Sequence, residues 1–212
     1  MFVIRELTPV EARVLAVLVE KQHTVPDSYP LSLNALTLGC NQKTAREPVM
    51  NLSEAEVLAA LNALKDLSLV FEVSGSRVTR FEHNLKRVYG IPGQSEALLT
   101  TLVLRGPQTV AELRLNCERL HRFADLSSVE GFLDELTTRE PPLARLLPKA
   151  PCAREPRWVS LLCGAPDPAS LISAPVQSGR SELAEEVAAL RVELDALKAE
   201  VAQLRQALGE GA

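Results

Sequence analysis

The chain has 212 residues, of which 46% are hydrophobic and only eight are aromatic, so aliphatic packing of helices is favoured over a large β-sandwich or barrel. The formal net charge is −4, but residues 180–212 hold four basic and seven acidic residues, which leaves the remainder close to neutral. This balance disfavours a strongly basic nucleic-acid-binding domain, since such domains carry a clear excess of Lys and Arg.

Targeting signals and cysteine motifs are both missing from the sequence pattern. No apolar run approaches the ~20 residues of a membrane span, and the first residues lack a cleavage pattern, so we expect a cytoplasmic protein with no membrane partner. The cysteines have no C-x-x-C spacing and no nearby pair of histidines, which predicts free thiols and no metal site. They are Cys40, Cys117, Cys152 and Cys163.

Three helices followed by a hairpin are expected in the first part of the chain. Pro9 suits the first position of a helix over residues 10–21, and Ser32 can cap a second helix that ends near Cys40. Ser53 and Glu56 form a capping-box pattern before a third helix. Two β-rich runs, residues 69–73 and 77–83, then surround a tight turn. This is the element order of a winged helix.

The second part repeats that order. Helices are expected over residues 95–104, from Thr109 onward and over 126–138, followed by strands at 143–147 and 157–162. We therefore predict a mostly α fold with small β-hairpin wings, of the α+β class, in two tandem winged-helix domains at residues 1–90 and 91–163. Cys40 and Cys117 fall near the end of the second helix in each copy, where a small apolar residue packs into the core.

The C-terminal segment has the pattern of a coiled coil. Residues 164–180 are rich in Pro, Ser and Gly and predict a linker before a helix at residues 181–209. Apolar residues then alternate at spacings of four and three without a break, which predicts a seam that pairs two copies. Glutamates before this seam and cations after it favour a parallel dimer, because an antiparallel one would place like charges together. The alternative is an amphipathic helix docked on its own domain. The seam consists of Leu183, Val187, Leu190, Leu194, Leu197, Val201, Leu204 and Leu208.

Several runs of sequence resemble the YceH-like bacterial family, and together they cover nearly the whole chain. The resemblance implies a pair of winged-helix domains with a helical C-terminus in an uncharacterised family, and it brings no catalytic or ligand-binding residues with it. The clearest runs are Tyr29-Pro30-Leu31-Ser32-Leu33-Asn34-Ala35-Leu36-Thr37, Cys40-Asn41-Gln42-Lys43, Arg46-Glu47-Pro48-Val49 and Leu104-Arg105-Gly106-Pro107-Gln108-Thr109.

The expected third helices are acidic, which disfavours ordinary insertion into the major groove because carboxylates repel phosphate. A better nucleic-acid surface is the first wing and its exit, joined by cations of the loop after the second helix. The alternative is that these cations are solvated charges paired with neighbouring glutamates. The candidate DNA contacts are Arg77, Arg80, Lys86, Arg87, Lys43 and Arg46.

Catalysis has little support in the sequence. His23, His83 and His121 lie in three separate elements, and none stands beside a Cys, Ser or Asp at a spacing that builds a nucleophile. No phosphate-binding or dinucleotide-binding motif occurs, so we expect no cofactor. Two hypotheses remain. The first is a dimeric DNA-associated regulator with basic wings, which the commonest use of the fold favours. The second is a non-catalytic scaffold whose acidic third helices bind a basic protein.

Overall fold

A computed structural model describes residues 5–73, 78–149 and 155–165 of the chain. These residues belong to one compact unit that extends to Pro166. The predicted coiled coil with its dimer seam, nearly all of the predicted linker, Arg77 and Cys152 lie outside the described residues.

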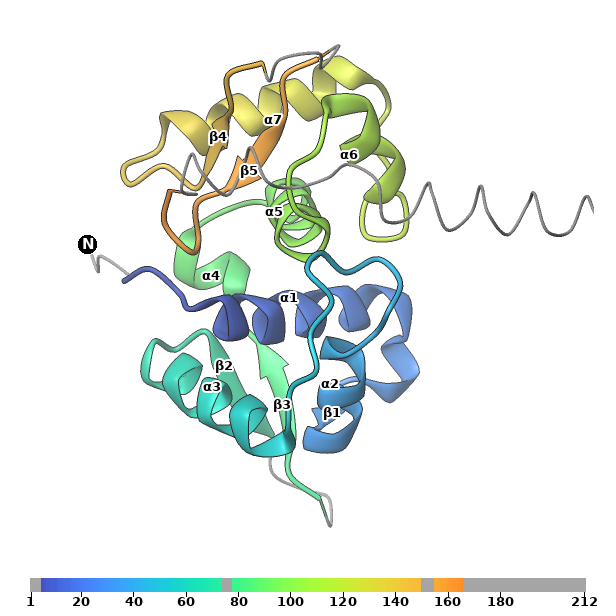
Figure 1. Cartoon of the computed structure of the whole chain (residues 1–212), viewed down its shortest axis with the longest axis vertical. Helices are drawn as coiled ribbons and strands as arrows, with labels where there is room; N and C mark the ends of the chain where they lie inside the picture. Colours follow the sequence, from blue (N-terminus) through green and yellow to red (C-terminus); the bar gives the residue numbers. More distant parts are fainter. Residues whose placement is uncertain (1–4, 74–77, 150–154, 166–212) are drawn as a thin grey trace, which may run out of the picture. The chain divides into compact units, whose positions relative to one another are not determined.

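The first half of the unit runs from α1 to α4 (Figure 1) and contains the three predicted helices and the predicted hairpin. Its elements are α1 (Pro9–Thr24), a 3-10 turn (Pro26–Ser28), β1 (Leu31–Ser32), α2 (Leu33–Cys40), α3 (Glu54–Asp66), β2 (Val70–Val73), β3 (Arg80–His83) and α4 (Leu85–Tyr89). The short β1 and α4 were not predicted. β1 pairs antiparallel with β3, Leu31 opposite Phe81, and gives a three-stranded sheet in the order β1-β3-β2.

The second half runs from α5 to β5 and confirms the predicted repeat. It contains α5 (Gly93–Arg105), α6 (Val110–Asn116), α7 (Leu126–Thr138), β4 (Ala144–Leu146) and β5 (Trp158–Ser160), with β4 and β5 paired antiparallel. Gln108 forms an isolated bridge with Trp158, in the place that β1 takes in the first half. The described residues therefore have an α+β, winged-helix-like fold.

Local capping chemistry explains why the predicted helix starts are correct. Complete capping boxes start three helices: α1 at Thr8, α3 at Ser53 and α6 at Thr109. In each, a glutamate three residues on accepts a hydrogen bond from the backbone N–H of the cap residue. The side chains of Ser32 and Asp125 accept hydrogen bonds at the starts of α2 and α7.

The two first helices form the centre of the unit. α1 lies between α5 on one side and α2 and α3 on the other (Figure 1). All residues from Glu11 to Val19 are buried in consequence, and so are all residues from Ser95 to Leu102 in α5. A helix packed on all sides buries its polar residues too, so charged groups such as Glu11, Arg13 and Glu96 need partners inside the fold.

The two halves are also joined by backbone hydrogen bonds. Glu47 N–H donates to Leu104 O at 2.7 Å, and Leu7 N–H donates to Leu162 O at 2.7 Å. The predicted domain boundary near residue 90 falls in the short connection between α4 and α5, while both halves belong to the same compact unit. The division into two domains remains a prediction. None of the described helices is both long and apolar enough to cross a membrane.

Candidate interaction surfaces

The outward face of α3 combines small apolar residues with acidic ones. Val57, Ala60, Leu61 and Leu64 are buried in the core, and the opposite side of the helix faces solvent. Leu58 leaves 40% of its surface exposed at the centre of this face. The exposed residues at helical spacing, named here the α3 stripe, are Ala55, Leu58, Ala59, Asn62 and Asp66.

Carboxylates at the start of α3 are held in place by local hydrogen bonds. Glu54 accepts from the Asn34 side chain at 3.2 Å. Glu56 accepts from the backbone N–H of Ser53 at 2.8 Å and from its hydroxyl at 2.7 Å, and these bonds lower the pKa of the Glu56 carboxyl. Lys65 is the single cation of α3, and it pairs with Glu72 of β2. The helix therefore presents no unpaired positive charge.

The equivalent helix of the second half is acidic as well. α7 buries Val129, Leu133 and Leu136 and contains no Lys or Arg. Its exposed carboxylates are Glu130, Asp134 and Glu135. The next cation, Arg139, donates to the carbonyl oxygens of Tyr89 and Gly90 in the first half. Both α3 and α7 thus expose carboxylates that no Lys or Arg of the same helix neutralises.

Two of the proposed DNA contacts are engaged inside the fold. The Arg46 side chain has no exposed surface, and its guanidinium holds Glu20 through two hydrogen bonds of 3.1 and 2.6 Å. It also donates to Gly39 O and to the Gln42 side chain. Arg80 is half-buried and donates to Pro30 O at 2.7 Å, which braces the turn before β1. Arg46 therefore cannot reach a phosphate without breaking a buried ion pair.

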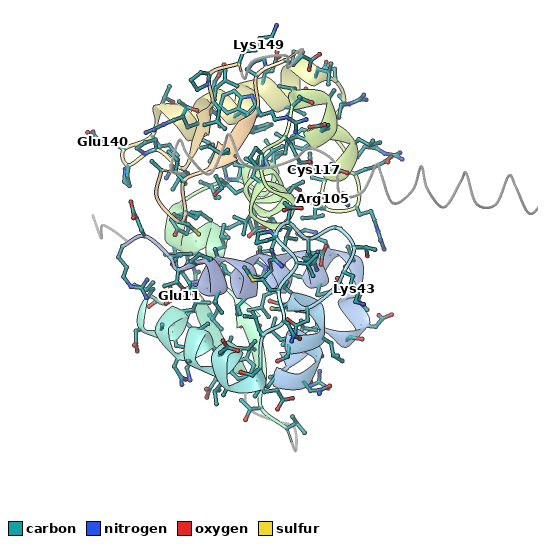
Figure 2. All side chains as sticks on the ribbon, in the orientation of Figure 1. Glu11, Lys43, Arg105, Cys117, Glu140 and Lys149 are labelled. Atoms are coloured by element: carbon teal, nitrogen blue, oxygen red, sulfur yellow. The ribbon has the colours of Figure 1, made fainter. Side chains whose placement is uncertain are left out.

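The other described candidate DNA contacts differ in whether a carboxylate lies close to them. Lys43 follows α2 (Figure 2) and Arg87 lies on α4; both are exposed and have no carboxylate partner among the described residues. Lys86 is 49% exposed, with Nζ 3.6 Å from Glu96 Oε2. Arg77 lies outside the described residues. Among the described candidates, Lys43 and Arg87 thus have neither an ion pair nor a side-chain hydrogen bond.

A buried cluster around Glu96 of α5 was not predicted from the sequence. Glu96 has no exposed surface, and neither carboxylate oxygen has a hydrogen-bond partner among the described residues. His83 Nδ1 lies 3.6 Å from Oε1, and His23 Nε2 lies 4.0 Å from Oε2. Because α1, β3, α4 and α5 each supply a residue, no local sequence pattern could have revealed the cluster.

Burial shifts the pKa of most groups in this cluster toward the neutral form. It raises the pKa of Glu96, which the Lys86 ammonium opposes, and it lowers the pKa of His83 to about 4 with help from the charges of Lys86 and His23. Burial, Lys86 and His121 lower the pKa of His23. The structure therefore brings two of the three histidines to one carboxylate, and the third acts on His23.

Among the described residues, Cys163 is an exposed free thiol, whereas the two other cysteines lie in the core. Cys40 and Cys117 are fully buried, as predicted, and burial raises the pKa of each to about 12 (Cys117 is labelled in Figure 2). Both therefore behave as core residues rather than nucleophiles. No group of three or more His, Cys, Asp or Glu side chains among the described residues is placed to hold a metal ion.

Comparison with known proteins places this fold in a bacterial family. A family model described as "Protein of unknown function, DUF480" matches residues 7–153. A UPF0502 protein of Burkholderia pseudomallei strain 668 is 65% identical over 206 residues, which cover 95% of this chain and 86% of the relative. A UPF0502 protein of Methylibium petroleiphilum is 64% identical over 200 residues, with 93% and 85% covered. These matches agree with the YceH-like resemblance, and the chain belongs to the DUF480 family of UPF0502 proteins.

Proposed function

We propose that the chain is a non-catalytic protein-interaction module that binds a basic partner through the α3 stripe. The observation that carries this proposal is the composition of the stripe, which has an exposed leucine between two alanines, acidic residues at both ends of the helix and no unpaired cation. Alanines let a partner backbone approach closely, and Leu58 supplies apolar surface to bury. The carboxylates favour Lys or Arg on the partner.

The same features disfavour DNA at this helix. A helix in the major groove lies between two phosphate backbones, where each carboxylate raises the electrostatic free energy and lysines or arginines lower it. Glu54, Glu56 and Asp66 all work against binding there, and Lys65 is already paired with Glu72. The acidic α7 has the same disadvantage.

DNA contact through the loop after α2 and through α4 is the second candidate. Exposed and unpaired Lys43 and Arg87 support it. Two cations neutralise few phosphates, so this mode predicts weak binding that falls steeply as salt is added. Fluorescence anisotropy with random duplex DNA at low and moderate salt measures it directly, and submicromolar affinity at moderate salt would favour this candidate over the first.

The test of the α3 stripe compares a variant with lysines on α3 with a control variant that has lysines on α7. Leu58→Lys with Asp66→Lys changes the stripe without touching the capping box of Ser53 and Glu56. Affinity capture followed by mass spectrometry should lose at least one partner, with about tenfold less recovery, because an apolar anchor and an acidic contact are both lost. Glu130→Lys with Asp134→Lys on α7 is the matched control. An unchanged partner list for the α3 variant contradicts the proposed surface.

We also propose that the C-terminal seam pairs two copies in parallel, so that one assembly carries two α3 stripes. The support is the sequence pattern of residues 181–209 alone. Two linked sites raise the avidity for a partner that is itself repeated. Sedimentation velocity should show a dimer for the full chain and a monomer for a chain that ends at Gly179. A full chain that sediments as a monomer at micromolar concentration would contradict the proposed dimer.

A further inference from the structure

The cluster around Glu96 links the two halves of the unit through titratable groups. Glu96 belongs to α5 in the second half, whereas His23, His83 and Lys86 come from α1, β3 and α4 of the first half. Their nitrogens lie 3.6–4.0 Å from the carboxylate oxygens. These contacts are too long for good hydrogen bonds, so the carboxylate is held by charge and by the surrounding packing.

The described geometry fits a neutral His83. Its Nε2 lies 2.8 Å from Gln22 Oε1, and its Nδ1 accepts from the backbone N–H of Leu85 at 3.4 Å. If Nε2 carries the proton, Nδ1 has the lone pair that this acceptor role requires. A second proton would have to enter at Nδ1, which would end the bond from Leu85 and direct a charged N–H at Glu96.

One carboxylate cannot balance the cations that acidification would create. Lys86 already neutralises the charge of Glu96. Glu96 and Lys86 together carry no net charge, so each proton that His23 or His83 takes up leaves a positive charge without a counterion in the cluster. Other ionisable groups near the cluster are His121, whose charge acts on His23, and Tyr29, whose ring packs edge-on against His83 and whose hydroxyl accepts from the His83 backbone N–H. Glu82, like Glu96, acts on Tyr29.

We propose that His23, His83, Lys86 and Glu96 form an acid-sensitive latch that holds α5 against the first half and loosens when the two histidines take up protons. Loosening the latch changes the position of α7 relative to α3, and therefore the spacing of the two acidic helices. The inference does not depend on which macromolecule α3 binds.

The direction of the pH dependence follows from the histidines. His83 in the folded chain has a pKa of about 4, below its ordinary value, so the unfolded chain binds more protons between these two values. The stabilising contribution of neutral His83 is complete at neutral pH and is lost as the pH falls from about 6.5 toward 4. Glu96, whose pKa is raised, acts in the opposite direction, because its protonation relieves the burial of a charge. The variants below separate the two effects.

The experiment measures distance and stability on the full chain. Fluorophores on non-canonical amino acids at Asn62 of α3 and Ser127 of α7, both exposed, report the spacing of the halves by energy transfer. Between about pH 7.5 and about pH 4, the labelled chain should show a reversible change in transfer and lose up to roughly 100-fold in its folding equilibrium constant. The double variant His23→Gln, His83→Gln should keep its transfer constant and lose no such stability, because only the opposite effect of Glu96 remains.

Two single variants keep the test decisive. His121→Gln removes a histidine that does not face Glu96 and should keep the pH response. His23→Gln changes a side chain that is 34% exposed, so the fold tolerates it, and it should weaken the response. The proposal is overturned if the double variant responds like the natural chain, or if transfer in the natural chain stays constant over this range while circular dichroism shows that it is folded.

Discussion

At the scale of single residues, the structure separates cations that look alike in the sequence. Arg46 and Lys43 lie three residues apart in one loop, yet Arg46 is buried against Glu20 and Lys43 is exposed. Glu20 is 26 residues from Arg46 in the chain, so no local sequence pattern predicts this ion pair. Arg13, also buried, donates to Cys40 O and Pro48 O. These two arginines fix the long loop between α2 and α3 onto α1.

Replacing Arg46 should therefore destabilise the fold strongly. Arg46→Met removes both hydrogen bonds to the mostly buried Glu20 carboxylate and leaves Lys21, 3.5 Å away, to balance its charge, which costs roughly 3 kcal/mol of unfolding free energy. Lys43→Met in the same loop should change it by less than about 0.5 kcal/mol. Urea unfolding monitored by the fluorescence of Trp158 compares them. Equal midpoints for the two variants would mean that the ion pair between Arg46 and Glu20 does not stabilise the fold.

At the scale of elements, close packing of α2 on α1 depends on Gly39. A Cβ atom at Gly39 would lie 2.7 Å from Val17 Cγ1, whereas one at Gly131 of α7 would meet nothing within 4 Å. Gly39→Ala should cost about 1–3 kcal/mol through overpacking. Gly131→Ala should instead stabilise by about 0.5–1 kcal/mol, since alanine is the better helix former. Thermal unfolding of the two variants checks the opposite signs, and a stabilised Gly39→Ala would contradict the described contact.

The elements that sequence predicted correctly are those with local signals. The capping boxes at Ser53 and Thr109 lie within one turn of the helices that they start, and the hairpin strands follow from runs of β-branched residues. β1 and α4 were missed because two and five residues carry too little periodicity, and β1 exists only through its pairing with the distant Phe81. Burial of α1 on all sides also depends on α5, far along the chain.

At the scale of the whole molecule, the proposed interaction surface lies on a unit whose geometry the proposed latch controls. The α3 stripe and the acidic α7 are carried by halves that meet at α1 and α5, and the cluster at Glu96 lies on that contact. The sequence alone favoured DNA binding, because winged helices commonly bind DNA and because the first wing carries several cations. The described burial of Arg46 and the pairing of Lys65 shift the balance to a protein partner.

The most direct test of the central claim is site-specific photo-crosslinking in cells that express the full chain. A photoreactive residue at Ala59 in the α3 stripe should yield a discrete protein adduct that survives nuclease treatment. The same residue at Arg87 on α4 is the control position and should yield no such adduct. Nuclease-sensitive adducts from Arg87, together with no protein adduct from Ala59, would contradict the protein-interaction account and establish nucleic acid as the partner.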